Sequence, residues 1–285
     1  MRIIKRKKGN EEYFYLQHSF RKKGRIITKE RYLGKEIPKN LEEIKGDLAK
    51  EQKTELFSKL ERIKQDFQSE WKNIPESVKA KEKEEISIAF TYNTNAIEGS
   101  TITLEETREI IHDKIAPNKP LRDIRETEAH SKVFLKMLDK KEKLTASLLM
   151  QWHKEIFKDT KQDIAGRYRD YLVRIGPHLP PDWQDVQKLM NSLLKFANQK
   201  KMNPVELAAR VHYLFEKIHP FGDGNGRIGR LIVNSILWHS RYPMLILEYK
   251  NRRSYYKALT KEENKFVNYF IRRYLSIHKR RLGKK

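Results

Sequence analysis

The stretch Ile218–Arg230, which reads Ile-His-Pro-Phe-Gly-Asp-Gly-Asn-Gly-Arg-Ile-Gly-Arg, constrains the fold of this chain more than any other. Before it, apolar residues recur at helical spacing after Asn203-Pro204, a pair typical of a helix N-terminus. After it, apolar residues from Ile228 onward repeat along one helical face. The sequence therefore predicts two helices joined by a short loop that is rich in glycine.

The backbone of this loop is suited to binding an anion. Gly222, Gly224 and Gly226 allow successive N–H groups to turn toward one point. The second helix begins in the loop, so its unpaired N–H groups and its positive dipole end face the same point. Arg227 and Arg230 lie one turn apart and can reach further phosphates. We therefore predict a site for a polyphosphate.

Two polar side chains of the loop add chemistry to this site. Asp223 supplies a hard oxygen of the kind that Mg²⁺ prefers. His219 ends the first helix, where a neutral imidazole can take a proton from an incoming hydroxyl. Residues 224–229 also match the dinucleotide-binding pattern, but that pattern requires a preceding buried strand, and here a helix precedes it. The stretch therefore indicates phosphate chemistry on a helix–loop–helix unit.

The same stretch resembles the signature of the Fic family, His-Pro-Phe-x-Asp/Glu-Gly-Asn-Gly-Arg-x-x-Arg, at every defined position. Members of this family transfer the AMP of ATP to a protein hydroxyl. The resemblance implies that His219 is the general base and that Asp223 binds Mg²⁺. It also implies a set of nucleotide-binding residues in the loop and the second helix: Gly224, Asn225, Gly226, Arg227 and Arg230.

A second motif, Thr94-Asn95-Ala96-Ile97-Glu98-Gly99, ends a predicted helix. A carboxylate in the last turn lies beside the negative end of the helix dipole, so Glu98 is expected to have a cationic partner. The motif also resembles the inhibitory helix of Fic proteins. The resemblance implies that Glu98 pairs with Arg230 and keeps the γ-phosphate from its productive position. Thr94, Glu98 and Gly99 are the inhibitory residues that it implies.

Two further segments take their expected roles from the resemblance. Residues 166–181 contain Gly and Pro and interrupt the helical pattern, which predicts a β-hairpin. In Fic proteins such a flap lies over the nucleotide and pairs with the target, which here implicates Val173, Ile175 and Gly176. A tyrosine pair, Tyr255 and Tyr256, is expected on the adenine side.

Residues 1–39 predict a small antiparallel β-meander, with strands at 2–6, 12–20 and 25–33 and turns at 8–10 and 22–24. This segment is strongly basic and carries Tyr13, Phe14 and Tyr15. Such a ribbon can contact nucleic acid, or it can be an appendage that packs its aromatic side chains on the helices. The sequence leaves these two interpretations open.

Composition limits the class of protein. Lys and Arg total 61 and Asp and Glu total 38, a formal net charge of +23, which favours polyanionic partners. The chain has no cysteine, so disulfides and thiolate metal sites are excluded. Residues 1–8 lack the apolar core of a signal peptide, and no apolar run reaches membrane-spanning length. We therefore expect a cytoplasmic protein that does not enter membranes.

The expected organisation has three parts: the basic meander at 1–39, helices at 40–99 that end in the inhibitory motif, and a catalytic domain at 100–285. Capping boxes at Thr103–Glu106 and Thr260–Glu263 are expected to open helices. The fold class is mainly α, a Fic-type helical bundle with a β-hairpin flap and a small N-terminal β-meander.

The predicted function is adenylyl transfer from ATP, with Mg²⁺, to a Ser, Thr or Tyr hydroxyl of an unidentified protein target, which the protein itself can be. Relatives with Lys in place of Gly226 turn the nucleotide around and phosphorylate, so the glycine favours adenylyl transfer. Two alternatives remain open: hydrolytic removal of AMP by the same site, and a basic nucleic-acid-binding module with a non-catalytic phosphate loop. A homo-oligomer is also left open.

Overall fold

The structure is a computed structural model that describes residues 1–22, 25–176, 178–199 and 201–283; the side chains of residues 18–22, 25–27 and 47–52 lie outside this description. The chain divides into two compact units, Met1–Ser58 and Lys59–Lys285. The division falls inside the first helix, α1, which spans Leu41–Asn73.

The first unit contains a three-stranded antiparallel sheet of β1 (Arg2–Lys8), β2 (Glu11–Lys22) and β3 (Arg25–Gly34), in the order β1-β2-β3. The turn between β1 and β2 contains Gly9 with a φ of 64°, a conformation that costs glycine little. The predicted meander is thus confirmed. Residues 23 and 24 of the second predicted turn lie outside the described residues.

The second unit is helical. Its helices are α2 (Glu76–Ile97), α3 (Leu104–Arg108), the π-helical turn η1 (Glu109–Asp113), α4 (Leu121–Asp139), α5 (Ala146–Phe157), α6 (Trp183–Ala197), α7 (Pro204–Ile218), α8 (Asn225–His239), the 3₁₀ turn η2 (Tyr249–Asn251), α9 (Arg252–Leu259), α10 (Glu263–Ile277) and α11 (Arg280–Gly283). The expected mainly α fold with a small antiparallel sheet is therefore confirmed. No helix among the described residues is both long and apolar enough to cross a bilayer.

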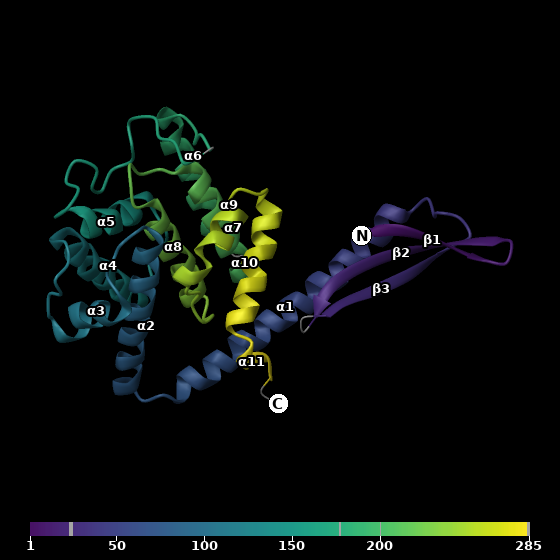
Figure 1. Ribbon diagram of the computed structural model, residues 1–285, viewed down its shortest axis with the longest axis horizontal. Helices are drawn as coiled ribbons and strands as arrows, with labels where there is room; N and C mark the ends of the chain where they lie inside the picture. Colours follow the sequence, from purple (N-terminus) through teal and green to yellow (C-terminus); the bar gives the residue numbers. More distant parts are fainter. Residues whose placement is uncertain (23–24, 177, 200, 284–285) are drawn as a thin grey trace. The chain divides into compact units, whose positions relative to one another are not determined.

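Helix α8 forms the centre of the second unit. It packs against α7 on one side and against α4 and α2 on the other (Figure 1). Most of its residues are buried, from Asn225 at its start to Leu237 near its end. A helix that is buried around most of its circumference lies inside the protein, and here the buried residues include Arg227 and Arg230. The loop that precedes α8 is therefore held between several helices.

Helix starts show where the sequence patterns succeed and fail. Thr103 caps α3 as expected: its side chain accepts from the N–H of Glu106, and the Glu106 carboxylate accepts from the N–H of Thr103. The second predicted capping box is wrong, because α10 begins at Glu263 after Glu262 and has no side-chain cap. Thr260 instead ends α9, where its hydroxyl donates to the carbonyl of Lys257.

The predicted hairpin at 166–181 is reduced to a single antiparallel residue pair. The N–H groups of Ile175 and His178 each donate to the carbonyl of the other, at 3.0 and 2.9 Å. Gly176, which follows Ile175, has a φ of 55°. The rest of the described segment has no strand.

Candidate active site

The loop between α7 and α8 has a backbone that few residues adopt. His219 ends α7 in the left-handed conformation, with a φ of 51°, and its N–H donates to the carbonyl of Phe215. Gly224, immediately before α8, has a φ of 75°. A Cβ atom at this position would overlap the ring of Phe157, so a side chain is excluded by both strain and space.

Asn225 locks this loop into shape. Its Oδ1 accepts from the N–H of Phe221 at 2.9 Å, and its Nδ2 donates to the carbonyl of Phe221 at 2.8 Å. The residue is 2% exposed, so the amide is committed to the loop. Asn225 can therefore offer an anion only its backbone N–H, which lies at the start of α8.

Arg169 holds the loop in place by binding carbonyl groups at and around the end of α7. Its position in the sequence does not predict this role. Its guanidinium donates to the carbonyl groups of His219, Tyr171 and Pro181 at 2.9, 2.9 and 2.6 Å. Its own backbone N–H donates to the carbonyl of Pro220. The arginine is 4% exposed, and its charge lies at the negative end of the α7 dipole. Arg169 therefore holds the backbone at His219, where α7 ends.

The ring of His219 is partly buried, and its Nδ1 atom is fully buried. Its Nδ1 has no hydrogen-bond partner among the described residues. Burial lowers the pKa of His219 to about 4, because the charged imidazolium is poorly solvated there. The ring is consequently neutral at pH 7, the state that a proton acceptor requires.

His153 has a different environment and supports the loop. Its ring stacks on Phe221 with centroids 4.1 Å apart. Because its Nδ1 accepts from the N–H of Gly166, its Nε2 carries the proton and donates to the carbonyl of Asp223 at 3.0 Å. His153 is fully buried, and these contacts give it a structural role.

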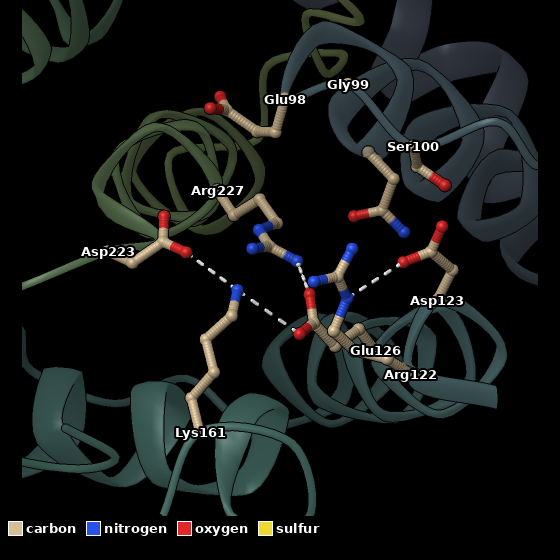
Figure 2. Close-up of a pocket in the computed structure, with 10 residues that line it drawn as sticks. Glu98, Gly99, Ser100, Arg122, Asp123, Glu126, Lys161, Asp223 and Arg227 are labelled. Atoms are coloured by element: carbon tan, nitrogen blue, oxygen red, sulfur yellow. Dashed lines mark hydrogen bonds and ion pairs between the residues drawn. The ribbon is translucent and has the colours of Figure 1, made fainter. Parts of the chain in front are cut away.

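A chain of alternating charges runs beside the loop (Figure 2). Lys161 Nζ lies 2.7 Å from Oδ2 of Asp223 and 3.3 Å from Oε1 of Glu126. The other oxygen of Glu126 binds Arg227. Burial opposes ionisation of Asp223, but the hydrogen bond and charge of Lys161 outweigh it and keep the pKa of Asp223 below its ordinary value. Asp223 is therefore ionised and half-exposed.

A cavity of about 230 Å³ opens between the end of α2, the start of α4 and the loop. Figure 2 shows the side chains around it. Four of the predicted site residues line it: Glu98, Gly99, Asp223 and Arg227. Asn95, Ser100, Arg122, Asp123, Glu126 and Lys161 also line it and were not predicted.

Glu98 and Thr94 together hold Arg230. Nε of Arg230 donates to the hydroxyl of Thr94 at 2.6 Å, and its Nη2 donates to Oε1 of Glu98 at 2.6 Å. Arg230 is 2% exposed. A Cβ atom at Gly226 would overlap Oε1 of Glu98, so a side chain at residue 226 would require this carboxylate to shift.

Two N–H groups near the cavity lack protein partners. Nε of Arg227 and Nη1 of Arg230 are buried, and neither has an acceptor among the described residues. Buried donors without acceptors are costly and usually indicate a missing ligand or water. These two donors are compatible with phosphate oxygens of a bound nucleotide.

The structure does not bring the expected adenine and flap residues to this cavity. Tyr255 is 2% exposed, and its hydroxyl binds Nε2 of His212 in the core. Tyr256 is 44% exposed and donates to the carbonyl of Ile97 at the end of α2. The flap residues Val173, Ile175 and Gly176 are also absent from the cavity lining.

The residues present fit a single Mg²⁺ ligand rather than a cage. Among the described residues, no three His, Asp or Glu side chains lie close enough to form a metal site. Mg²⁺ commonly binds proteins through one or two carboxylates and completes its shell with substrate phosphates and water. The half-exposed, ionised carboxylate of Asp223 meets that requirement.

Comparisons with known proteins point to one family. Residues 143–237 match the model of the Fic/DOC family. A protein adenylyltransferase Fic from Nematostella vectensis is 35% identical over 189 residues, which cover 64% of this chain and 44% of that protein. The chain spans less than half the length of the curated relatives with which it is compared here.

Solved structures give the same answer. A Fic domain containing signaling protein from Bacteroides thetaiotaomicron aligns with a TM-score of 0.67 and 26% identity, over 80% of this chain and 98% of that one. A Fic family protein from Desulfovibrio desulfuricans aligns with a TM-score of 0.68 and 26% identity, over 81% of this chain and 74% of that one.

Proposed function

Residues 143–237 form a domain of the Fic/DOC family, and on that premise we propose that this chain transfers AMP from ATP to a hydroxyl group of a protein. The observation that carries the proposal is the neutral, partly buried imidazole of His219 at the end of α7, in the glycine-bearing loop that leads into the N-terminus of α8. Relatives named protein adenylyltransferase Fic support the same reaction class.

In this proposal His219 is the general base. The oxygen of the target hydroxyl attacks the α-phosphorus of ATP, and its proton passes to the imidazole. The bond between the α-phosphorus and the bridging oxygen breaks, and pyrophosphate leaves with that electron pair. Because the ring is neutral well below pH 7, it accepts the proton without first having to lose one.

The loop and α8 supply the phosphate contacts. The N–H groups of Gly224, Asn225 and Gly226 surround the α-phosphate, and Arg227 and Arg230 bind the outer phosphates. Asp223 would hold Mg²⁺, which neutralises phosphate charge when bound. Most of the rate enhancement then comes from positioning and from charge stabilisation rather than from covalent chemistry.

We further propose that the structure is a resting state in which Glu98 inhibits the enzyme. The Glu98 carboxylate already binds the guanidinium of Arg230, the side chain assigned to an outer phosphate. A γ-phosphate would have to displace this carboxylate and would be repelled by it. Release of the end of α2 would then be the activating step.

In domain terms, residues 100–285 carry the catalytic machinery, residues 40–99 carry the inhibitory helix, and residues 1–39 are not required for transfer. The direct test is intact-mass analysis after incubation with Mg²⁺ and ATP, on the wild type and on Glu98→Gly. The Glu98 variant is expected to gain the mass of AMP on itself or on added protein. A variant that binds ATP but never acquires that mass would refute the proposal.

A further inference from the structure

One face of the N-terminal sheet carries side chains that adenylyl transfer does not use. The strand register places Arg2 opposite Gln17, Arg6 opposite Tyr13, and Tyr15 opposite Tyr32. Since side chains opposite each other in a ladder lie on the same face, these residues form one surface. Ile4, opposite Tyr15, and Glu30, opposite Gln17, lie on the same surface. We call its basic, amide and aromatic side chains the arginine–tyrosine face and define it as Arg2, Arg6, Tyr13, Tyr15, Gln17 and Tyr32.

The side chains of this face are held in place by one another. Arg2 Nε donates to Gln17 Oε1 at 2.6 Å, and Gln17 Nε2 donates to Glu30 at 2.9 Å. Arg6 donates to the same Glu30 oxygen at 2.8 Å, and its guanidinium lies 5.1 Å from the centre of the Tyr15 ring. Polar groups that are already oriented lose less side-chain entropy when a partner binds.

This face is not the core of its unit. Leu16 is the one buried residue among the described side chains of Met1–Ser58, and by alternation it points to the opposite face. Tyr32 is 54% exposed, and the Arg6 side chain is 55% exposed. Tyr32 and Arg6 therefore do not belong to the core of this unit.

The charge of this segment favours a polyanion. Residues 1–40 contain thirteen Lys and Arg against four Asp and Glu, an excess of nine positive charges. The segment also lies outside the residues that match the Fic/DOC family model. Local ion pairs such as Arg6–Glu30 orient individual side chains but leave the net excess unchanged. Such an excess on a short ribbon attracts phosphate backbones at long range.

We propose that the arginine–tyrosine face binds double-stranded DNA. Arg and Gln are side chains that pair with purine edges, and a β-ribbon fits a major groove about 12 Å wide. A-form RNA is disfavoured because its major groove is too deep and narrow for side chains to read. The surrounding Lys and Arg residues bind phosphates, and the face residues lie against the bases. This inference goes beyond the proposed AMP transfer and does not rest on it.

The test is fluorescence anisotropy of a labelled DNA duplex with the full chain, at several salt concentrations. The face variant is Arg2→Gln with Arg6→Gln. The matched control is Lys188→Gln with Lys195→Gln, which removes the same charge from exposed positions of α6. The face variant is expected to bind at least about tenfold more weakly, because it loses base contacts. The control is expected to bind like the wild type.

Tyr32→Ser gives a second variant that keeps every charge and changes an exposed side chain. It is also expected to weaken duplex binding, and because Tyr32 contacts the rings of Tyr13 and Tyr15, circular dichroism is used to check that the sheet is retained. Equal loss of affinity in the face and control variants would overturn the proposal, because binding would then reflect overall charge alone. Stronger binding to single-stranded RNA or to anionic lipid vesicles than to duplex DNA would overturn it too. AMP transfer is measured in parallel and should be unchanged in all these variants.

Discussion

Arg230 donates a 2.6 Å hydrogen bond from Nη2 to Oε1 of Glu98, a residue 132 positions earlier in the chain. The arginine is buried and the glutamate is partly exposed, so the contact joins the centre of the bundle to the rim of the cavity. Thr94 binds the same guanidinium through its hydroxyl and its carbonyl. The end of α2 is thereby fixed against α8.

Replacing Glu98 with Gly should raise activity and lower stability together. The carboxylate would no longer occupy Arg230, and the gain in AMP transfer is expected to be about 5–150-fold, the range of typical coupling energies. Loss of the charged hydrogen bond to a buried guanidinium should reduce the free energy of unfolding by about 1–3 kcal/mol. Transfer of label from ATP and thermal unfolding measure the two effects.

The control for this variant is Glu105→Gly, which introduces the same glycine at an exposed helical position outside the cavity lining. It should lose some stability without gaining activity. A Glu98 variant with wild-type activity, or a control that is activated equally, would contradict inhibition by Glu98.

Replacing His219 with Asn should remove catalysis while leaving the loop intact. Asn tolerates the left-handed backbone that residue 219 adopts, whereas Ala would add strain. Loss of a general base typically lowers the rate about 10²–10⁴-fold. ATP affinity, measured by calorimetry, should change little. A variant that retains most of its rate would show that another group accepts the proton.

Lys161 should compete with a divalent cation for Asp223. Its ammonium group lies 2.7 Å from the carboxylate that is assigned to Mg²⁺. In Lys161→Met this carboxylate loses its positive partner, so Mn²⁺ used as a paramagnetic probe should bind more tightly, as measured by electron paramagnetic resonance without nucleotide. Lys158→Met, an exposed lysine nearby in sequence, is the control. Weaker Mn²⁺ binding in the Lys161 variant would instead indicate that this lysine supports the metal site.

Buried histidines should make the protein sensitive to mild acid. Burial lowers the pKa of His153 to about 4, below its ordinary value of 6.5. Below pH 6.5 the unfolded chain therefore binds a proton that the folded chain does not, and stability is lost as the pH falls from about 6.5 toward 4. The full difference is about 3 kcal/mol for this residue. Urea unfolding across that pH range measures it.

In His153→Asn part of this pH dependence should disappear, because the titrating group is gone. Its removal also breaks the support of the loop, so the comparison concerns the slope of stability against pH rather than stability at one pH. His112→Asn, at an exposed position, is the control. An unchanged slope in the His153 variant would show that other groups carry the acid sensitivity.

The sequence was most informative where a signal is local. The helix–loop–helix and the capping box at Thr103 follow from residues a few positions apart, and both are present. The same pattern failed at Thr260, because the preceding helix extends to Leu259 and uses the threonine hydroxyl at its own end. The same Thr-x-x-Glu spacing can therefore occur at the end of one helix or at the start of another.

The cavity lining depended on long-range packing that the sequence did not reveal. Lys161 and Glu126 approach the loop only because α4 and the segment after α5 pack beside α8. No periodicity relates these residues to Asp223. The same holds for Arg169, which binds carbonyl groups at the end of α7 from a position 50 residues earlier. The close approach of the Glu98 carboxylate to Gly226 is likewise visible only in the folded chain.

The central claim is that the loop binds ATP so that the α-phosphorus, and not the γ-phosphorus, is attacked. Parallel reactions of Glu98→Gly with ATP labelled at the α-phosphate and with ATP labelled at the γ-phosphate test it most directly. The account predicts stable protein labelling from the α-labelled nucleotide alone, and none with His219→Asn added. Labelling from the γ-labelled nucleotide, or from neither under conditions where ATP binds, would contradict it.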